Sequence, residues 1–155
     1  MIGLAPLEVL YEAEQGEDLP LPPGLTSLCG RFRFPPRTGR PYIVANFVTT
    51  LYGVVSLRAP GHEGGGDISG FNQDDRVVMG LLRAISDAVV VGVGTLRAAP
   101  QHLWTAEYIC PSLAHEYVER RASLGKPEPP LNVIVSGTGE SGLTFACCGP
   151  TKSQL

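Results

Sequence analysis

The stretch Asp87-Ala-Val-Val-Val-Gly-Val-Gly-Thr-Leu-Arg97 joins an apolar, mostly β-branched run to a Gly-X-Gly-Thr turn and a basic residue. An unbroken apolar run that ends in glycines is typical of a strand buried on both faces at the centre of a parallel sheet. Gly92 and Gly94 would allow a sharp turn and a close approach to a ligand, while Thr95 adds a hydroxyl and a backbone N–H. The stretch therefore predicts a central strand followed by a phosphate-binding turn.

A strand and a helix are predicted before this stretch. Tyr42–Val48 is β-branched and aromatic, and it ends in the polar turn Thr49–Gly53. Residues 72–85 show helical periodicity, with Asn72 as the N-cap and Asp75 near the positive end of the helix dipole. Together with the following strand, these segments would form a right-handed βαβ unit.

A further helix and strand are predicted after the stretch. The helix is expected near residues 112–124, and the strand Leu131–Val135 ends in the turn Ser136–Gly139. Ligands of open α/β sheets collect at the carboxyl ends of the strands. Because each of the three predicted strands is followed by a polar turn containing glycine, the sequence predicts a pocket at that edge.

Composition restricts the class of protein. The chain has 155 residues, of which 43% are apolar and 17% charged, so one domain is expected. A net charge of −3 without a lysine-rich run argues against a dedicated nucleic-acid binder. No apolar segment has the length of a membrane span, and the first residues lack the basic start of a signal peptide. A cytoplasmic location is therefore expected.

The cysteines and histidines form no recognisable metal motif. Cys147 and Cys148 are adjacent and the other two cysteines are isolated, so free thiols are expected. His62 precedes a glutamate, but no Pro-Cys-x-x-Cys of a zinc deaminase follows. No metal site is predicted.

The chain divides into three predicted parts. Residues 13–41 are rich in proline, glycine and acid, and residues 1–38 are predicted to form an extended arm. Residues 39–140 would form the domain, within which Gly61–Gly70 has the composition of a mobile segment that covers a site. Residues 141–155 are interpreted as an atypical tail.

Three blocks resemble a known family. They are Arg40-Pro-Tyr-Ile-Val-Ala-Asn-Phe-Val-Thr-Thr-Leu-Tyr-Gly53, Asp75-Arg-Val-Val-Met-Gly-Leu-Leu-Arg-Ala-Ile-Ser-Asp-Ala88 and Val91-Gly-Val-Gly-Thr-Leu-Arg97. Their order and spacing are similar to the pyrimidine reductases of riboflavin biosynthesis. The resemblance implies a dihydrofolate-reductase-like α/β fold of three layers, with a mostly parallel central sheet. It also implies NADPH-dependent reduction of the ribosyl group of 5-amino-6-(5-phosphoribosylamino)uracil to ribityl, and it allows a homodimer.

The resemblance implies a cofactor site. Gly92, Gly94 and Thr95 would hold the cofactor's phosphates, assisted by Arg97. Ser136 would lie near the adenosine 2′-phosphate. The bound NADPH would supply the hydride, and the protein would orient it in a water-poor pocket.

The resemblance also implies a substrate site. Asn46, Thr49 and Thr50 would border the nicotinamide and the pyrimidine substrate. Asp75 is the candidate catalytic acid, because a carboxylate accepts hydrogen bonds from ring N–H and amino groups. The alternative is that Asp75 is only the third helical residue of a capping box with Asn72.

Two departures from the family pattern leave other interpretations open. Tyr52 stands where the family usually carries an acid, and the family's later Gly-Gly turn and closing strands have no counterpart. The chain is therefore expected to be a C-terminally truncated or frameshifted form, poorly folded and of little activity. A non-catalytic nucleotide-binding remnant and a dihydrofolate reductase are the alternative functions.

Overall fold

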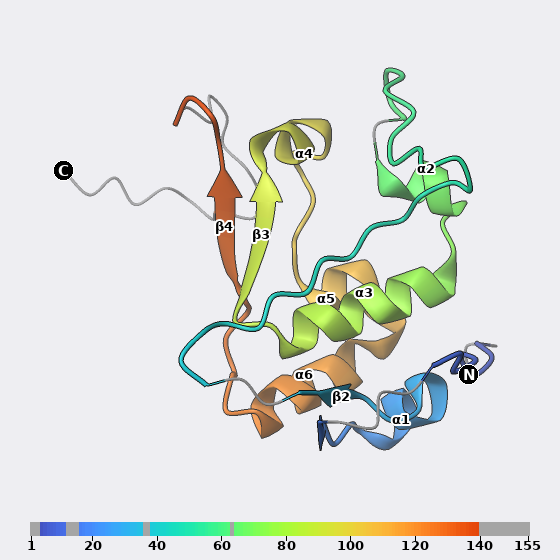
Figure 1. The fold of residues 1–155 in the computed structure, drawn as a ribbon, viewed down its shortest axis with the longest axis vertical. Helices are drawn as coiled ribbons and strands as arrows, with labels where there is room; N and C mark the ends of the chain where they lie inside the picture. The colour runs from blue at the N-terminus through green and yellow to red at the C-terminus, as the bar shows by residue number, and fades with distance from the viewer. Residues whose placement is uncertain (1–3, 12–15, 36–37, 63, 140–155) are drawn as a thin grey trace.

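The computed structural model describes residues 4–11, 16–35, 38–62 and 64–139, and the chain mixes helices with strands. In chain order these residues form β1 (Glu17–Asp18), α1 (Pro23–Cys29), β2 (Arg33–Phe34), α2 (Gly65–Ser69), α3 (Gln73–Ile85), β3 (Ala88–Gly92), α4 (Val93–Ala98), α5 (Ala106–Ile109), the 3₁₀ helix η1 (Pro111–Leu113), α6 (Ala114–Ser123) and β4 (Leu131–Val135). Helices α1, α3, α5 and α6 gather on one side of the molecule, and β3, β4 and α4 lie on the other (Figure 1).

Strands β3 and β4 pair in parallel. Their register runs from Ala88 opposite Leu131 to Gly92 opposite Val135. The prediction that these two segments share one sheet is therefore confirmed. The second pair in the described residues, β1 with β2, is antiparallel and short.

A mostly parallel central sheet is not present in the described residues, which hold two sheets of two strands each. The predicted strand Tyr42–Val48 has no regular secondary structure, and nearly all of it is exposed. Its β-branched and aromatic residues favour an extended backbone, but a strand also needs a hydrogen-bonded partner. Within the described ranges the only strand paired with β3 is β4.

Burial of β3 on both faces is also wrong. Exposed and half-buried residues alternate along β3 and along β4, which is the pattern of a sheet packed on one face. The inner face contacts a small cluster formed by Leu96 of α4 and Trp104. The opposite face leaves Val90 64% exposed and Val135 57% exposed.

Helix α3 confirms the helix predicted from periodicity. The Asn72 side-chain oxygen accepts hydrogen bonds from the backbone N–H groups of Asp74 and Asp75, at 2.8 and 3.1 Å. This cap satisfies two of the N–H groups that have no partner within the helix. Val77 and Leu81 are buried on the face that packs against α5 and α6.

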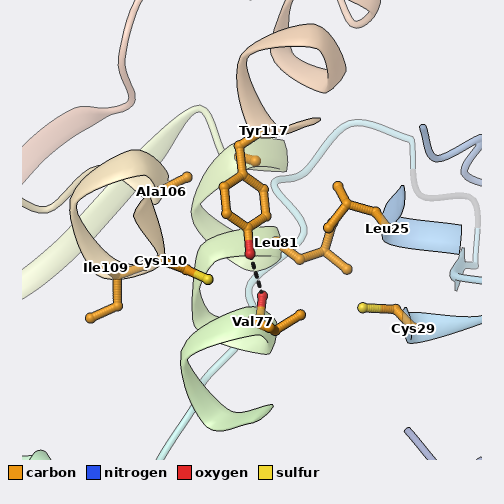
Figure 2. Packing of buried hydrophobic residues seen from close by; sticks show 9 residues of the cluster. Leu25, Cys29, Val77, Leu81, Ala106, Ile109, Cys110 and Tyr117 are labelled. Carbon is orange, nitrogen blue, oxygen red and sulfur yellow. Dashed lines mark hydrogen bonds between the residues drawn. The ribbon is translucent and has the colours of Figure 1, made fainter. Parts of the chain in front are cut away.

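The main core lies where α1, α3, α5 and α6 meet. Figure 2 shows the Tyr117 ring of α6 against α3, with its hydroxyl donating to the Val77 carbonyl at 3.1 Å. A Cβ on Gly80 would lie 2.6 Å from this ring, so the close approach of α6 depends on that glycine. The buried members of this cluster are Leu25, Cys29, Val77, Leu81, Ala84, Ala106, Ile109, Cys110 and Tyr117.

The N-terminal segment is not an extended arm throughout. Helix α1 lies within it, begins with a proline in its first turn, and buries Leu25 and Cys29 in the main core. The glycine-rich stretch Gly61–Gly70 likewise contains the short helix α2. The helix predicted near residues 112–124 is confirmed as η1 followed by α6.

Candidate functional site

The turns that follow β3 and β4 leave the sheet side by side. Gly92, the last residue of β3, is opposite Val135, the last residue of β4. The chain enters α4 directly after β3 (Figure 1). After β4, Ser136 opens a turn in which its hydroxyl lies 3.5 Å from the Thr138 hydroxyl. The structure therefore brings the predicted phosphate-binding turn and Ser136 to one edge.

The two glycines of this turn are not required by its backbone. Gly92 has φ −76° and ψ 146°, which any residue can adopt, and it occupies the N-cap position of α4. A Cβ on Gly92 or Gly94 would meet no atom within 4 Å. The turn from β3 into α4 therefore does not depend on glycine, and what the glycines provide is open space before the first N–H groups of α4.

The other cofactor residues predicted on α4 face solvent. Thr95 and Arg97 are both exposed, and Arg97 belongs to the last turn of the helix. Free N–H groups in the first turn, a hydroxyl and a nearby cation are all suited to an anionic ligand.

The predicted substrate residues lie elsewhere in the fold. Asn46 and Thr49 are exposed on a segment without regular secondary structure, which runs toward α2 (Figure 1). Thr50 begins a turn in which its hydroxyl accepts from the Val54 N–H at 3.1 Å. A Cβ on Gly65 would lie 3.2 Å from Val48, so this segment contacts α2. None of the three predicted residues follows a strand.

Asp75 occupies the third position of α3 and forms half of a capping box. Its backbone N–H donates to the Asn72 side chain, but its carboxylate forms no hydrogen bond or ion pair within the described part of the chain. Burial raises the pKa of the Asp75 carboxyl, and the charges of Arg76 and Arg83 oppose that rise. The helix cap therefore accounts for the backbone N–H of Asp75, and it leaves the carboxylate able to accept hydrogen bonds from a ligand.

A cluster that the sequence did not predict lies between α3 and residues 102–108. The Arg83 guanidinium Nη1 is 3.4 Å from His102 Nε2 and 3.4 Å from the Thr105 carbonyl. The His102 ring centroid is 4.4 Å from that of Trp104 and 4.7 Å from that of Tyr108. Arg83 also lies over the Trp104 ring, with its Cζ 5.3 Å from the centroid.

Burial controls the protonation of this cluster. It lowers the pKa of His102 to about 4, assisted by the positive charges of Arg83 and Arg76. It also lowers the pKa of Arg83 to about 10, and the negative charge of Asp75 opposes this. His102 is therefore neutral at pH 7 and Arg83 is charged. The one sequence signal was the close spacing of His102, Trp104 and Tyr108, which does not point to Arg83.

Comparison with known proteins identifies no relative of this chain. Protein-family models, curated proteins and solved structures were all compared with the chain, and none of them matches it.

The described ranges hold neither a metal cluster nor a membrane-spanning helix. No group of three or more His, Cys, Asp or Glu side chains that could hold a metal ion occurs there. The helices of these ranges include none that is both long and apolar enough to cross a membrane.

Proposed function

We propose that the chain binds NADPH at the edge where β3 and β4 end, and that it is a reductase. By its resemblance, the reaction would be that of the 5-amino-6-(5-phosphoribosylamino)uracil reductases of riboflavin biosynthesis, on a dihydrofolate-reductase-like fold. The observation that supports this most is the parallel register that sets Gly92 opposite Val135. Two turns containing glycine thereby meet at the edge where parallel sheets bind nucleotides.

The residues at this edge have chemistry suited to NADPH. Backbone N–H groups of Gly94 and Thr95 would donate to the pyrophosphate, because the space in front of them is open. Arg97 would add a positive charge from the last turn of α4, and the Ser136 hydroxyl would donate to the 2′-phosphate. The bound cofactor would supply a hydride from its nicotinamide.

Asp75 is the residue proposed to bind the pyrimidine. Its carboxylate is partly buried, has no partner in the described residues, and could accept hydrogen bonds from ring N–H and amino groups. The proposed roles of Asn46, Thr49 and Thr50 at the nicotinamide and substrate rest on the family resemblance alone.

A cofactor titration tests the binding proposal. NADPH fluorescence would be followed as the full chain is added, for the parent and for Gly94→Val, with NADH as the second ligand. We expect NADPH to bind more tightly than NADH. We also expect Gly94→Val to weaken NADPH binding about tenfold, or about 1.4 kcal/mol, because its side chain fills the approach to the backbone. Equal NADPH affinity for the two chains would exclude this site.

A second candidate function is a non-catalytic nucleotide-binding domain. The exposure of Asn46 and Thr49 on the segment that contacts α2 favours it, because neither residue is buried against other described residues. NADPH oxidation with the pyrimidine substrate separates the two functions. Turnover supports the reductase, whereas cofactor binding without oxidation supports the non-catalytic domain.

A further inference from the structure

The cluster of Arg83, His102, Trp104 and Tyr108 includes none of the residues proposed to hold NADPH, although Trp104 packs against Leu96 of α4. It contains more hydrogen-bond donors than acceptors. Arg83 is only 7% exposed, although a guanidinium carries five N–H donors and a full charge. Both of its hydrogen bonds come from Nη1, and both are 3.4 Å long, beyond the usual range for such bonds. Nε and Nη2 have no acceptor within the described part of the chain.

No carboxylate neutralises Arg83 at close range. Among the described residues none lies within 4 Å of its guanidinium, and Asp75 acts on it only through a longer-range attraction. Nε and Nη2 of Arg83 keep some contact with solvent, but a largely buried cation without a paired anion still loses most of its hydration, which is costly. The contact with the Trp104 ring offsets only part of this cost.

His102 and Trp104 add further donors without acceptors. Since His102 Nε2 faces the Arg83 guanidinium, which can only donate, Nε2 is the acceptor and Nδ1 carries the proton. That Nδ1–H has no acceptor in the described residues. The indole N–H of Trp104, a residue that is 9% exposed, is buried and also lacks a partner there.

We propose that this cluster binds an oxyanion, the carboxylate or phosphate group of a small molecule. Two oxygens of such a group would accept from the free nitrogens of Arg83, because the guanidinium fork matches carboxylate and phosphate geometry. The N–H groups of His102 and Trp104 would supply further donors. The ligand would thereby provide both the negative charge and the acceptors that the cluster lacks.

Intrinsic fluorescence tests this site directly, because Trp104 is the only tryptophan of the chain. The full chain would be titrated at pH 7 with sodium phosphate and, separately, sodium acetate, each against sodium chloride of equal ionic strength. We expect a saturable change with at least one oxyanion and none with chloride. The oxyanion that saturates at the lower concentration identifies the ligand class. Arg83→Gln should raise its midpoint at least tenfold, while Arg58→Gln, on an exposed residue, should not change it.

Several results would exclude oxyanion binding by this cluster. Absent or non-saturable changes with both oxyanions would exclude it, as would equal midpoints for the parent and Arg83→Gln. If Arg83→Gln shows no cooperative thermal transition, Arg83→Lys replaces it, because lysine keeps the charge and loses the fork. A higher midpoint in Arg83→Lys supports the site and an unchanged one excludes it. At saturation the Trp104 indole proton should also shift downfield in the NMR spectrum, and an unmoved resonance would contradict its role as a donor.

Discussion

Gly80 and Gly94 are both helical glycines, but their surroundings differ. A Cβ on Gly80 would lie 2.6 Å from the fully buried Tyr117 ring, whereas a Cβ on Gly94 would meet nothing within 4 Å. We expect Gly80→Ala to lower the free energy of unfolding by about 1–3 kcal/mol, since overpacking outweighs the gain in helix propensity. Gly94→Ala should leave it unchanged or raise it by up to about 1 kcal/mol. Urea unfolding of the two variants measures this, and equal effects would contradict the packing of α6 on α3.

His102 should make stability depend on pH. Its pKa is about 4 in the folded chain, below its ordinary value of 6.5, because burial and the charges of Arg83 and Arg76 disfavour the protonated ring. As pH falls from about 6.5 to about 4, the unfolded chain takes up a proton that the folded chain does not, so stability decreases. Burial raises the pKa of Asp75, so the folded chain takes up this proton at a higher pH than the unfolded chain does, and stability increases as the carboxyl is protonated. This contribution is the same in the parent and in any His102 variant.

The measurement is the melting temperature between pH 7.5 and pH 4.5. His102→Gln removes the titrating ring and should flatten the decrease that the parent shows below about pH 6.5. Identical pH profiles for the parent and His102→Gln would show that His102 is not buried beside Arg83 as described.

Two substitutions at the start of α3 distinguish a capping role of Asp75 from a substrate-binding role. Asn72→Ala removes the side-chain oxygen that caps α3 and should cost about 1 kcal/mol of stability. Asp75→Asn keeps the capped backbone N–H, so its stability should change less than that of Asn72→Ala. If Asp75 binds the pyrimidine, Asp75→Asn should raise the activation free energy of turnover by about 1.5–3 kcal/mol. NADPH affinity should stay unchanged. Unchanged turnover with a lowered melting temperature would leave Asp75 as a cap.

The elements that could be predicted from the sequence are those with local determinants. Helix α3 combines a 3.6-residue apolar period with an asparagine cap, and both are visible in one short stretch. The strands β3 and β4 each have a β-branched run that ends in a turn. Tyr42–Val48 has the same local signal and forms no strand, because pairing depends on a partner that sequence pattern cannot supply.

Across the whole molecule, the candidate site could be predicted only in part. The edge formed by Gly92 and Ser136 followed from where parallel strands end, which is a rule of sheet topology. The contact of Arg83 with His102 joins residues 19 positions apart through the packing of α3 on a loop, and no spacing rule relates them. Apolar side chains are exposed on one face of the β3–β4 sheet and along the Tyr42–Val48 segment. Among them are Ile43, Phe47, Val90 and Val135.

The most direct test of NADPH binding at the β3–β4 edge is to map it by NMR on the full ¹⁵N-labelled chain. Spectra recorded during an NADPH titration should show the amide resonances of residues 92–97 and 136–139 shifting together and saturating at one midpoint. The amides of α1 and α6, on the other side of the molecule, should stay unchanged and serve as the internal control (Figure 1). Saturating NADPH that leaves the resonances of both turns unmoved, or that shifts only those of α1 and α6, would contradict the proposed site.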